Sequence, residues 1–547
     1  MGDKEQKVRD EEQKVKNKEL FIRPKSGLVR VLSVHDALIF NIVCIAFFCS
    51  SIYAFQMTSY LAPGANVSLT FLLTILFTLP LYLSWAMLAS SFPRSGGDYV
   101  FTSRLVLPSL AFAATFSAWI FWQLWYNACF PIQIIWQSIS PFLVMMGNSA
   151  ASDWVLSHTG MLVVGIMLLF LALLAAIPGM SFYAKLQRIL FAFTIVSIIL
   201  LLWVLASTNP ASFAERFNSF MAATTGNKID WYNQVINVAK EAGYVPAPFS
   251  WYDTLKLIPV AMMCMGYGFW SIMIMGEIKG AKETKLAVYS IYGSVIIMGL
   301  FFASLYALLQ NSGSLFYNSL FYLYMKGDPF ISQIPFWPNY MFIAAVASPN
   351  LLCTYLIQLG AAANVFNLMV MMYIVGARVM FAQTFDRIWP EKLSYLGTRY
   401  ISPIYALIVY FIGSVIWLIP AVFYPEIYFY FTAVVLGVLL AYVLTGIAGI
   451  TFPIRMKDAY EASPIAKYKI MGVPLIQISG IATLAFCGFL LYWYLTVPEL
   501  GLMNPISVSI VLIVYVVSLV YFYIIRWYRA KYQGINIDLA FKNIPPE

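Results

Sequence analysis

The chain has 547 residues, of which 61% are hydrophobic and only 10% are charged, and its formal net charge is +9. An ordinary soluble domain carries roughly 25% charged residues, and no soluble fold of this length could bury so much apolar surface. The composition therefore excludes a soluble protein and predicts an all-α integral membrane protein.

Apolar runs near the length of about 20 residues that crosses a bilayer predict twelve transmembrane helices. In chain order they lie at 37–59, 67–90, 108–138, 159–179, 186–206, 256–276, 286–309, 340–382, 402–422, 426–451, 474–496 and 505–527. The run at 340–382 is too long for one span. Its start is interpreted as a loop or interfacial helix ending at the turn signal 348–350, and the eighth span is expected to begin near Leu351.

Lys and Arg are distributed unevenly between the two sides that these spans define. The few that fall on the minority side are Arg216, Lys228, Lys240, Lys256 and Lys326. Because positive charge is retained in the cytoplasm, both termini are predicted to be cytoplasmic. Topology thus explains the positive net charge, with an anionic lipid bilayer as the partner surface and no nucleic acid.

The spans divide the chain into six parts. They are a polar cytoplasmic tail at 1–35, transmembrane helices 1–5 at 36–206, an extracellular loop with some helix at 207–255, helices 6–10 at 256–452, helices 11–12 at 453–530 and a cytoplasmic tail at 531–547.

Catalytic and metal-binding patterns are not found. The chain has no phosphate-binding loop, no nucleophile elbow and no pair of carboxylates within the spans, since nearly every acidic residue, Asp98 and Glu277 included, falls in a loop or at a helix end. His35 and His158 lie far apart, and the six cysteines lack metal-ligand spacing and are expected to pack as small apolar residues. We therefore expect no enzyme, no metal and no cofactor, and the missing intramembrane acid disfavours a polyamine substrate.

The sixth span contains a weak point. Gly266, Gly268 and Ser271 interrupt an apolar helix where lipid would demand an unbroken hydrogen-bond ladder. Isolated glycines of this kind more often serve only helix packing. A broken helix in the middle of the membrane instead indicates a binding site.

Four motifs occur in the order found in the amino acid-polyamine-organocation transporter superfamily. Residues 93–99 read Pro-Arg-Ser-Gly-Gly-Asp-Tyr, which resembles that superfamily's Pro-x-Ser-Gly-Gly-x-Tyr element. Residues 118–126 are similar to its Gly-Trp-x-x-Trp pattern, with Ala118 in place of the glycine. The stretch 267–279 and the segment 377–390, followed by an Arg-x-x-x-Pro at 399–403, resemble two further elements.

This resemblance implies a five-plus-five inverted-repeat (LeuT-like) core with two additional C-terminal helices, in which spans one and six are broken. Half-helix ends would receive the carboxylate and ammonium groups of a zwitterion. The substrate-binding residues it implies are Cys49, Ser50, Ser51, Trp122, Tyr126, Tyr267, Gly268, Phe269, Trp270 and Ser271. Trp122 and Tyr126, one helical turn apart, are expected to face one pocket, although the tryptophans of this span equally suit interfacial anchors.

The chain departs from the superfamily pattern at two places. Relatives carry Gly-x-Gly near 47–51, where this chain has Phe-Phe-Cys-Ser-Ser, which puts the shape of the carboxylate cradle in question. One branch of the superfamily carries a lysine in the fifth span. This chain has Thr194 or an apolar neighbour at that position, so a lysine-mediated proton mechanism is disfavoured. A coupling ion, H⁺ or Na⁺, at another site and plain exchange are the alternatives.

Polar residues elsewhere suggest a path and a gate. Asn364 and Asn367 lie on one face of the eighth helix. They are candidate ion ligands, although asparagines in such a setting more often form interhelical hydrogen bonds. Glu277 and Lys279 form a cytoplasmic gate or a plain solvated cluster.

The sequence therefore predicts a secondary active transporter of the plasma membrane that moves an amino acid or a related small amine-carboxylate by alternating access. The alternative is a membrane sensor or scaffold that binds a small ligand without transporting it, a reading that the lost Gly-x-Gly favours. Oligomeric state is left open.

Overall fold

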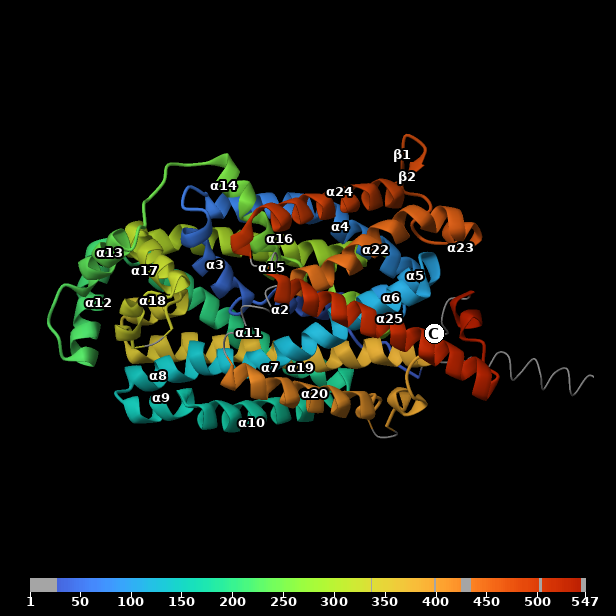
Figure 1. Ribbon diagram of the computed structural model, residues 1–547, viewed down its shortest axis with the longest axis horizontal. Helices are drawn as coiled ribbons and strands as arrows, with labels where there is room; N and C mark the ends of the chain where they lie inside the picture. Colours follow the sequence, from blue (N-terminus) through green and yellow to red (C-terminus); the bar gives the residue numbers. More distant parts are fainter. Residues whose placement is uncertain (1–26, 336, 398–399, 425–433, 501–503, 543–547) are drawn as a thin grey trace, which may run out of the picture.

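The computed structural model describes residues 27–335, 337–397, 400–424, 434–500 and 504–542. Most of the tail expected at 1–35, the start of the run at 426–451 and the last residues of the tail at 531–547 lie outside these ranges. Most of the long helices run side by side along the long axis of the molecule (Figure 1). The predicted all-α architecture is confirmed, since the only strands in the described ranges form a small hairpin, β1 (Lys469–Ile470) and β2 (Val473–Pro474).

The first half of the chain supplies the following elements. They are α2 (Val34–Ile45), α3 (Ser50–Leu61), α4 (Val67–Ser91), α5 (Asp98–Leu105), α6 (Pro108–Phe116), η1 (Ser117–Phe121), α7 (Trp122–Ile134), η2 (Ile135–Ile139), α8 (Ser140–Met145), α9 (Ser149–Leu156), α10 (His158–Ala176), α11 (Met180–Ala206), α12 (Pro210–Thr225), α13 (Trp231–Glu241), α14 (Trp251–Lys256), α15 (Ile258–Met265), η3 (Trp270–Met273) and η4 (Met275–Glu277).

The second half continues the bundle. Its helices are α16 (Thr284–Leu309), η5 (Gln310–Ser312), α17 (Ser314–Lys326), η6 (Pro329–Gln333), α18 (Tyr340–Ala347), α19 (Leu351–Phe385), η7 (Glu391–Ser394), α20 (Ile404–Phe423), α22 (Val434–Arg455), α23 (Lys457–Glu461), α24 (Leu475–Thr496), η9 (Pro498–Leu500), α25 (Pro505–Gln533) and η10 (Ile537–Lys542).

Within the described ranges, eleven helical segments are long and apolar enough to cross a membrane. The predicted first span differs from them, because it is divided into the short helices α2 and α3. The predicted sixth span is also interrupted, since α15 ends at Met265 and short 3₁₀ turns replace the helix beyond it.

The expected start of the eighth span near Leu351 is confirmed. The Asn350 side chain accepts a hydrogen bond from the Cys353 amide at 2.9 Å and so caps α19. The preceding apolar residues form α18, a separate helix that Asn339 caps in the same way. Asn339 thus caps the start of the apolar run, and the cap at Asn350 divides it into two helices.

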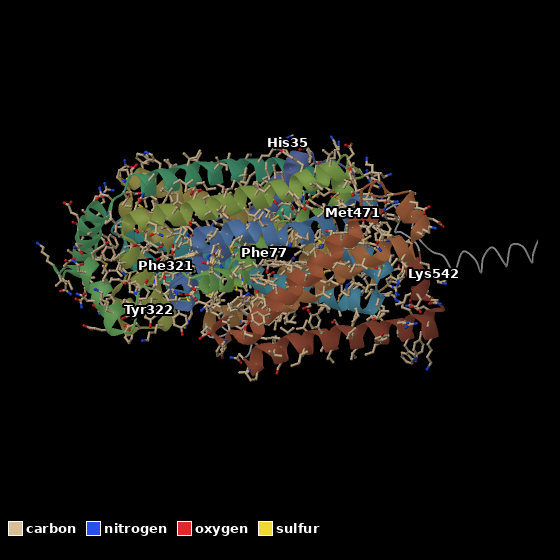
Figure 2. The ribbon with its side chains drawn as sticks, turned by 90° about the horizontal axis from the view of Figure 1, so that it is seen from above. His35, Phe77, Phe321, Tyr322, Met471 and Lys542 are labelled. Atoms are coloured by element: carbon tan, nitrogen blue, oxygen red, sulfur yellow. The ribbon has the colours of Figure 1, made fainter. Side chains whose placement is uncertain are left out.

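The two ends of the bundle differ in the elements they carry. Helices α12, α13, α17 and α18 gather at one end, and α5, α23 and the β1–β2 hairpin lie toward the other (Figure 1). Figure 2 places Tyr322 of α17 near the first end and both Met471 and Lys542 near the second. We refer to these as the α17 end and the α5 end.

Packing inside the bundle brings distant parts of the sequence together. Helix α16 packs against α4 and α2, α11 packs against α19, and α22 packs against α24. All six cysteines are buried, which agrees with their expected role as small apolar packing residues. Helix α25 instead exposes Leu512, Ile513, Val516 and Val520, the apolar surface expected where helices meet lipid.

Candidate functional site

The first break separates α2 from α3 at residues 46–49. Ala46 has a φ of 60°, a value that strains any residue with a Cβ. The carbonyl of Phe47 accepts hydrogen bonds from Ser51 Oγ at 2.7 Å and from Tyr340 Oη of α18 at 2.6 Å. The helix therefore breaks without Gly-x-Gly, and two hydroxyl groups satisfy the freed carbonyl. Ser50 begins α3, and its side chain lies outside the described part of the structure.

The second break occupies residues 266–269, after the last residue of α15. Three freed carbonyl groups, that of Met265 at the end of α15 and two within the break, accept hydrogen bonds from hydroxyls on three other helices. Tyr82 Oη of α4 donates to Met265, Tyr442 Oη of α22 donates to Gly266 at 2.7 Å, and Ser294 Oγ of α16 donates to Gly268 at 3.1 Å.

The glycines of this break are required for space. A Cβ on Gly266 would lie 2.6 Å from the Met262 carbonyl oxygen, and a Cβ on Gly268 would lie 2.9 Å from side-chain carbons of Ile45 and Val295. Neither glycine has a positive φ. Close approach of neighbouring helices, rather than the backbone freedom that the sequence suggested, explains why glycine stands here.

Asn41 joins the two broken segments. Its Oδ1 accepts a hydrogen bond from the Ser271 amide at 2.8 Å, and its Nδ2 donates to Ser271 Oγ at 3.0 Å and to the Ser290 carbonyl at 3.1 Å. Asn41, Ser271 and Ser290 are all buried. A side chain on α2 thus holds the start of η3 and a residue inside α16 at one point. Ser271 was predicted as a substrate residue, and its partner Asn41 was not predicted.

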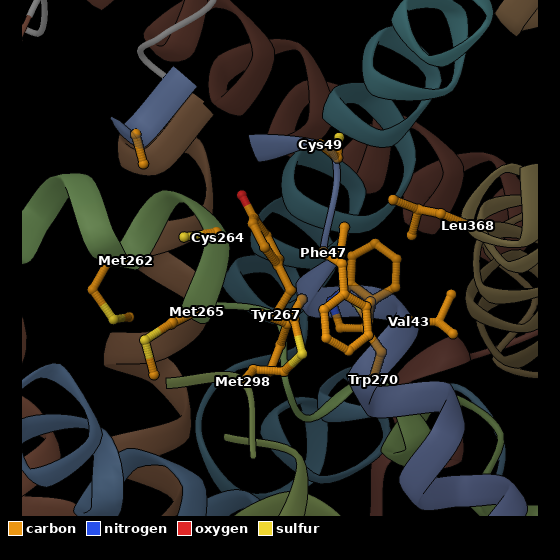
Figure 3. Packing of buried hydrophobic residues seen from close by; sticks show 14 of the residues in the cluster. Val43, Phe47, Cys49, Met262, Cys264, Met265, Tyr267, Trp270, Met298 and Leu368 are labelled. Carbon is orange, nitrogen blue, oxygen red and sulfur yellow. The ribbon is translucent and has the colours of Figure 1, made fainter. Parts of the chain in front are cut away.

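A small cavity of about 20 Å³ lies beside the breaks, about the room that a water molecule needs. Three of the predicted substrate residues, Tyr126, Tyr267 and Trp270, line it. The other lining residues are Cys44, Ala118, Gln123, Phe130, Leu368, Met372 and Val438. Figure 3 shows Tyr267, Trp270 and Leu368 in one region of the core with Phe47 and Cys49 of the first break.

The other predicted substrate residues lie around this cavity without lining it. Phe269 stacks on Trp85 with ring centroids 3.4 Å apart, and Cys49 is buried at the start of α3. Trp122 packs against Gly437 of α22. The two are so close that a Cβ on this glycine would lie 2.0 Å from Trp122 Nε1. The predicted shared pocket of Trp122 and Tyr126 is therefore not seen in this structure.

Gln123 shares the cavity with Tyr126 instead. The two residues are three apart on α7 and so lie on one helix face. Gln123 Nε2 and Trp270 Nε1 are buried donors that have no acceptor among the described residues. Buried donors are normally paired, so these two mark a place for an acceptor. An amide beside a tyrosine at helical spacing was the sequence signal that could have singled out Gln123.

The predicted polar pathway joins α11 to α19. Thr194 Oγ1 donates to the Leu190 carbonyl at 2.9 Å and lies 3.5 Å from the Gly360 carbonyl, and Tyr183 Oη donates to Asn367 Oδ1 at 3.0 Å. The bond to Leu190 stays within α11, whereas the contacts with Gly360 and Asn367 join α11 to α19. Asn364 is fully buried, and neither its Oδ1 nor its Nδ2 has a partner among the described residues.

The predicted gate residue Glu277 forms an ion pair near the α5 end. Its carboxylate accepts two hydrogen bonds from Arg378 of α19, at 2.9 and 3.0 Å, and both side chains are almost fully buried. The expected solvated cluster of Glu277 and Lys279 is therefore wrong for Glu277. Lys279 is exposed and contributes its backbone amide, which donates to the Leu32 carbonyl at 2.9 Å.

A second buried ion pair lies near the first. Arg104 of α5 donates two hydrogen bonds of 2.7 Å to Asp386 at the end of α19, and Tyr99 Oη donates a third, also of 2.7 Å. The 93–99 and 377–390 motifs, far apart in sequence, thus meet through the Tyr99–Asp386 hydrogen bond, and the Arg104–Asp386 ion pair lies beside it. With the pairing of residues 31–32 to 277–279, these contacts join α5, α19, η4 and the segment before α2 at the α5 end of the bundle.

Comparison with known proteins gives one match across most of the chain. A family model described as "Amino acid permease" matches residues 37–519. A comparison with curated proteins gave no match. The matched range includes both breaks, the cavity and both ion pairs.

Proposed function

Because the chain belongs to the amino acid permease family, we propose that it is a secondary active transporter that moves an amino acid across the plasma membrane by alternating access. The observation that carries this proposal is the meeting of two broken helices at Asn41 and Ser271, beside a cavity lined by Tyr126, Tyr267 and Trp270. Broken helices at a shared site are the device by which transporters offer backbone dipoles to a substrate.

The architecture proposed for this function has twelve spans, counting α2 and α3 as one. Two five-helix repeats of opposite orientation would begin with the two broken segments, and α24 and α25 would be added to them. The positions of the breaks, at the start of residues 34–206 and of residues 258–455, support this arrangement. The positive-inside distribution supports a cytoplasmic α5 end and cytoplasmic termini.

The cavity favours a neutral amino acid with an apolar side chain as substrate. Its described lining holds no ionised side chain and is largely aromatic and aliphatic. Gln123 Nε2 and Trp270 Nε1 offer two donors for a carboxylate, and the N-terminal end of α3 adds a positive dipole. A zwitterion would thus be held by dipoles and hydrogen bonds, with its side chain among the rings.

Entry of such a substrate requires the bundle to open. A cavity of about 20 Å³ is far smaller than an amino acid. The ion pairs Glu277–Arg378 and Arg104–Asp386 hold the α5 end closed. Separating these pairs would open a path from the breaks to the cytoplasm, and their re-formation would close it.

Transport by purified protein in liposomes tests the proposal. With sodium or proton gradients imposed, labelled neutral amino acids with apolar side chains should accumulate above protein-free liposomes. Gly268→Leu should abolish this flux while the protein stays folded, because the side chain would invade the contact with Ile45 and Val295. Stabilisation of the wild type by amino acids without any flux would contradict transport and favour a sensor.

A further inference from the structure

Asp98 is a carboxylate that the structure buries completely. It is the first residue of α5, directly after Gly97, whose φ of 63° turns the chain inward. Its two oxygens accept the indole N–H of Trp119, at 2.8 and 3.0 Å. Sequence patterns place this residue in a loop or at a helix end, and its burial is a finding of the structure.

The other ionisable groups near Asp98 do not form an ion pair with it. Those on α5, in the loop before it and on the neighbouring parts of the elements around it are Tyr99, Arg104, Arg94, Tyr82, Tyr373, Arg378, Asp386, Tyr442, Arg455, Asp538, Lys542 and Glu277. Arg104 pairs with Asp386, Arg378 with Glu277, and Asp538 with Arg526, while Arg455 donates to the Leu105 and Val106 carbonyls. Among the described residues, no salt bridge reaches Asp98.

Trp119 connects this carboxylate to the second break. Its ring meets Phe269 edge to face at a centroid distance of 5.5 Å and meets Trp270, which lines the cavity, at 5.9 Å. The loop before Asp98 is also tied to the same segment, because the Gly96 amide donates to the Met273 carbonyl at 2.9 Å. A change at Asp98 therefore has a short path of contacts to the site.

We propose that Asp98 is the site that binds the coupling proton, and that its protonation is transmitted through Trp119 to Phe269 and Trp270. This inference rests on the proposed transport function and adds the coupling ion to it. The proton adds to one carboxylate oxygen of Asp98, and no other bond forms or breaks. The neutral acid is a weaker acceptor than the carboxylate, so protonation loosens the hold on the Trp119 indole and on the rings beside it.

The environment of Asp98 suits a proton exchanged near neutral pH. Burial away from water disfavours the charged form and raises the pKa of Asp98 from 3.8 to about 7, although the hydrogen bond from Trp119 acts in the opposite direction. Protonation and release both remain accessible at such a value, as a coupling site requires.

Infrared difference spectroscopy of the purified protein tests proton binding without any substrate. The carbonyl stretch of a protonated carboxylic acid should appear in the wild type as pH falls through about 7, and Asp98→Asn should remove it. Glu283→Gln, which changes an exposed carboxylate in the loop before α16, should leave it in place. Trp119→Phe should move the midpoint to higher pH, because it deletes the bond that stabilises the charge. Absence of a band that Asp98→Asn removes would overturn the proposal.

Transport in liposomes tests coupling. With acid outside, wild-type protein and Glu283→Gln should accumulate a labelled neutral amino acid several-fold more than without a pH gradient. Asp98→Asn should keep exchange of labelled for unlabelled amino acid and lose the response to the gradient. An unchanged response, or loss of exchange as well, would overturn the proposal. If wild-type protein exchanged no amino acid at all, the proposed function would fail, and the infrared titration would still decide whether Asp98 takes up a proton.

Discussion

Ala46 occupies a backbone conformation that suits glycine, and this makes it the most informative single residue of the first break. A Cβ at a φ of 60° costs of order 1–3 kcal/mol, partly offset by the greater freedom that glycine has in the unfolded chain. Ala46→Gly should therefore stabilise the protein by about 1 kcal/mol. Unfolding in a denaturant series would measure this change.

The matched control for Ala46→Gly is Ala37→Gly, in the regular part of the same helix. It should instead destabilise the protein, because glycine inside a helix costs roughly 0.5–1 kcal/mol. Equal losses of stability in both variants would contradict the strained conformation of Ala46.

Gln123 provides a prediction about the substrate. Gln123→Leu removes a buried donor at the cavity, and the loss of one hydrogen bond to a substrate is worth about 1 kcal/mol, or about fivefold in affinity. Uptake kinetics should show KM raised by about this factor. Gln137→Leu, a similar change on the π-helical turn that follows α7, should leave KM unchanged. An equal rise in both variants would remove Gln123 from the site.

At the scale of elements, the contact of η4 with α19 depends on one buried ion pair. Glu277→Gln leaves the Arg378 guanidinium buried without a counter-charge, which typically costs about 3–5 kcal/mol. Thermal unfolding should show this loss, and Glu277→Gln combined with Arg378→Met should recover much of it. A double variant as unstable as the single one would mean that packing, not charge, holds the elements together.

The elements also show what sequence patterns can predict. Apolar length located most spans, and the turn signal at 348–350 located the start of α19, because an asparagine cap is a local interaction. The glycines at 266 and 268 correctly indicated a break. Its partner at 46–49 had no glycine, and only the resemblance to known transporters predicted it.

Long-range contacts were beyond the reach of local patterns. The partners of Glu277 and Asp98 lie on other elements, and the direction in which Trp122 points depends on π-helical turns that shift the helical register. Spacing along an ideal helix therefore placed Tyr126 in the cavity but could not exclude Trp122 from it.

For the whole molecule, Asp98 makes stability depend on pH. Because its pKa is raised from 3.8 to about 7, the folded protein binds more protons than the unfolded chain between these values, and stability falls as pH rises through this window. Asp98→Asn should flatten this dependence between about pH 4 and 7. Thermal unfolding across that range checks the slope, and a slope equal to that of the wild type would contradict the raised pKa.

The hydroxyl groups that satisfy the two breaks also determine which helices can move together. Tyr82 attaches the end of α15 to α4, Ser294 attaches the second break to α16, and Asn41 attaches α2 to α16. We therefore expect these four helices to move together as long as the hydrogen bonds persist. Tyr340 and Tyr442 attach the same breaks to α18 and α22. A rotation that opens the site would replace these two tyrosine hydrogen bonds with bonds to water or substrate. Each tyrosine would then hold the closed arrangement of α18 or α22 against the breaks and release it on opening.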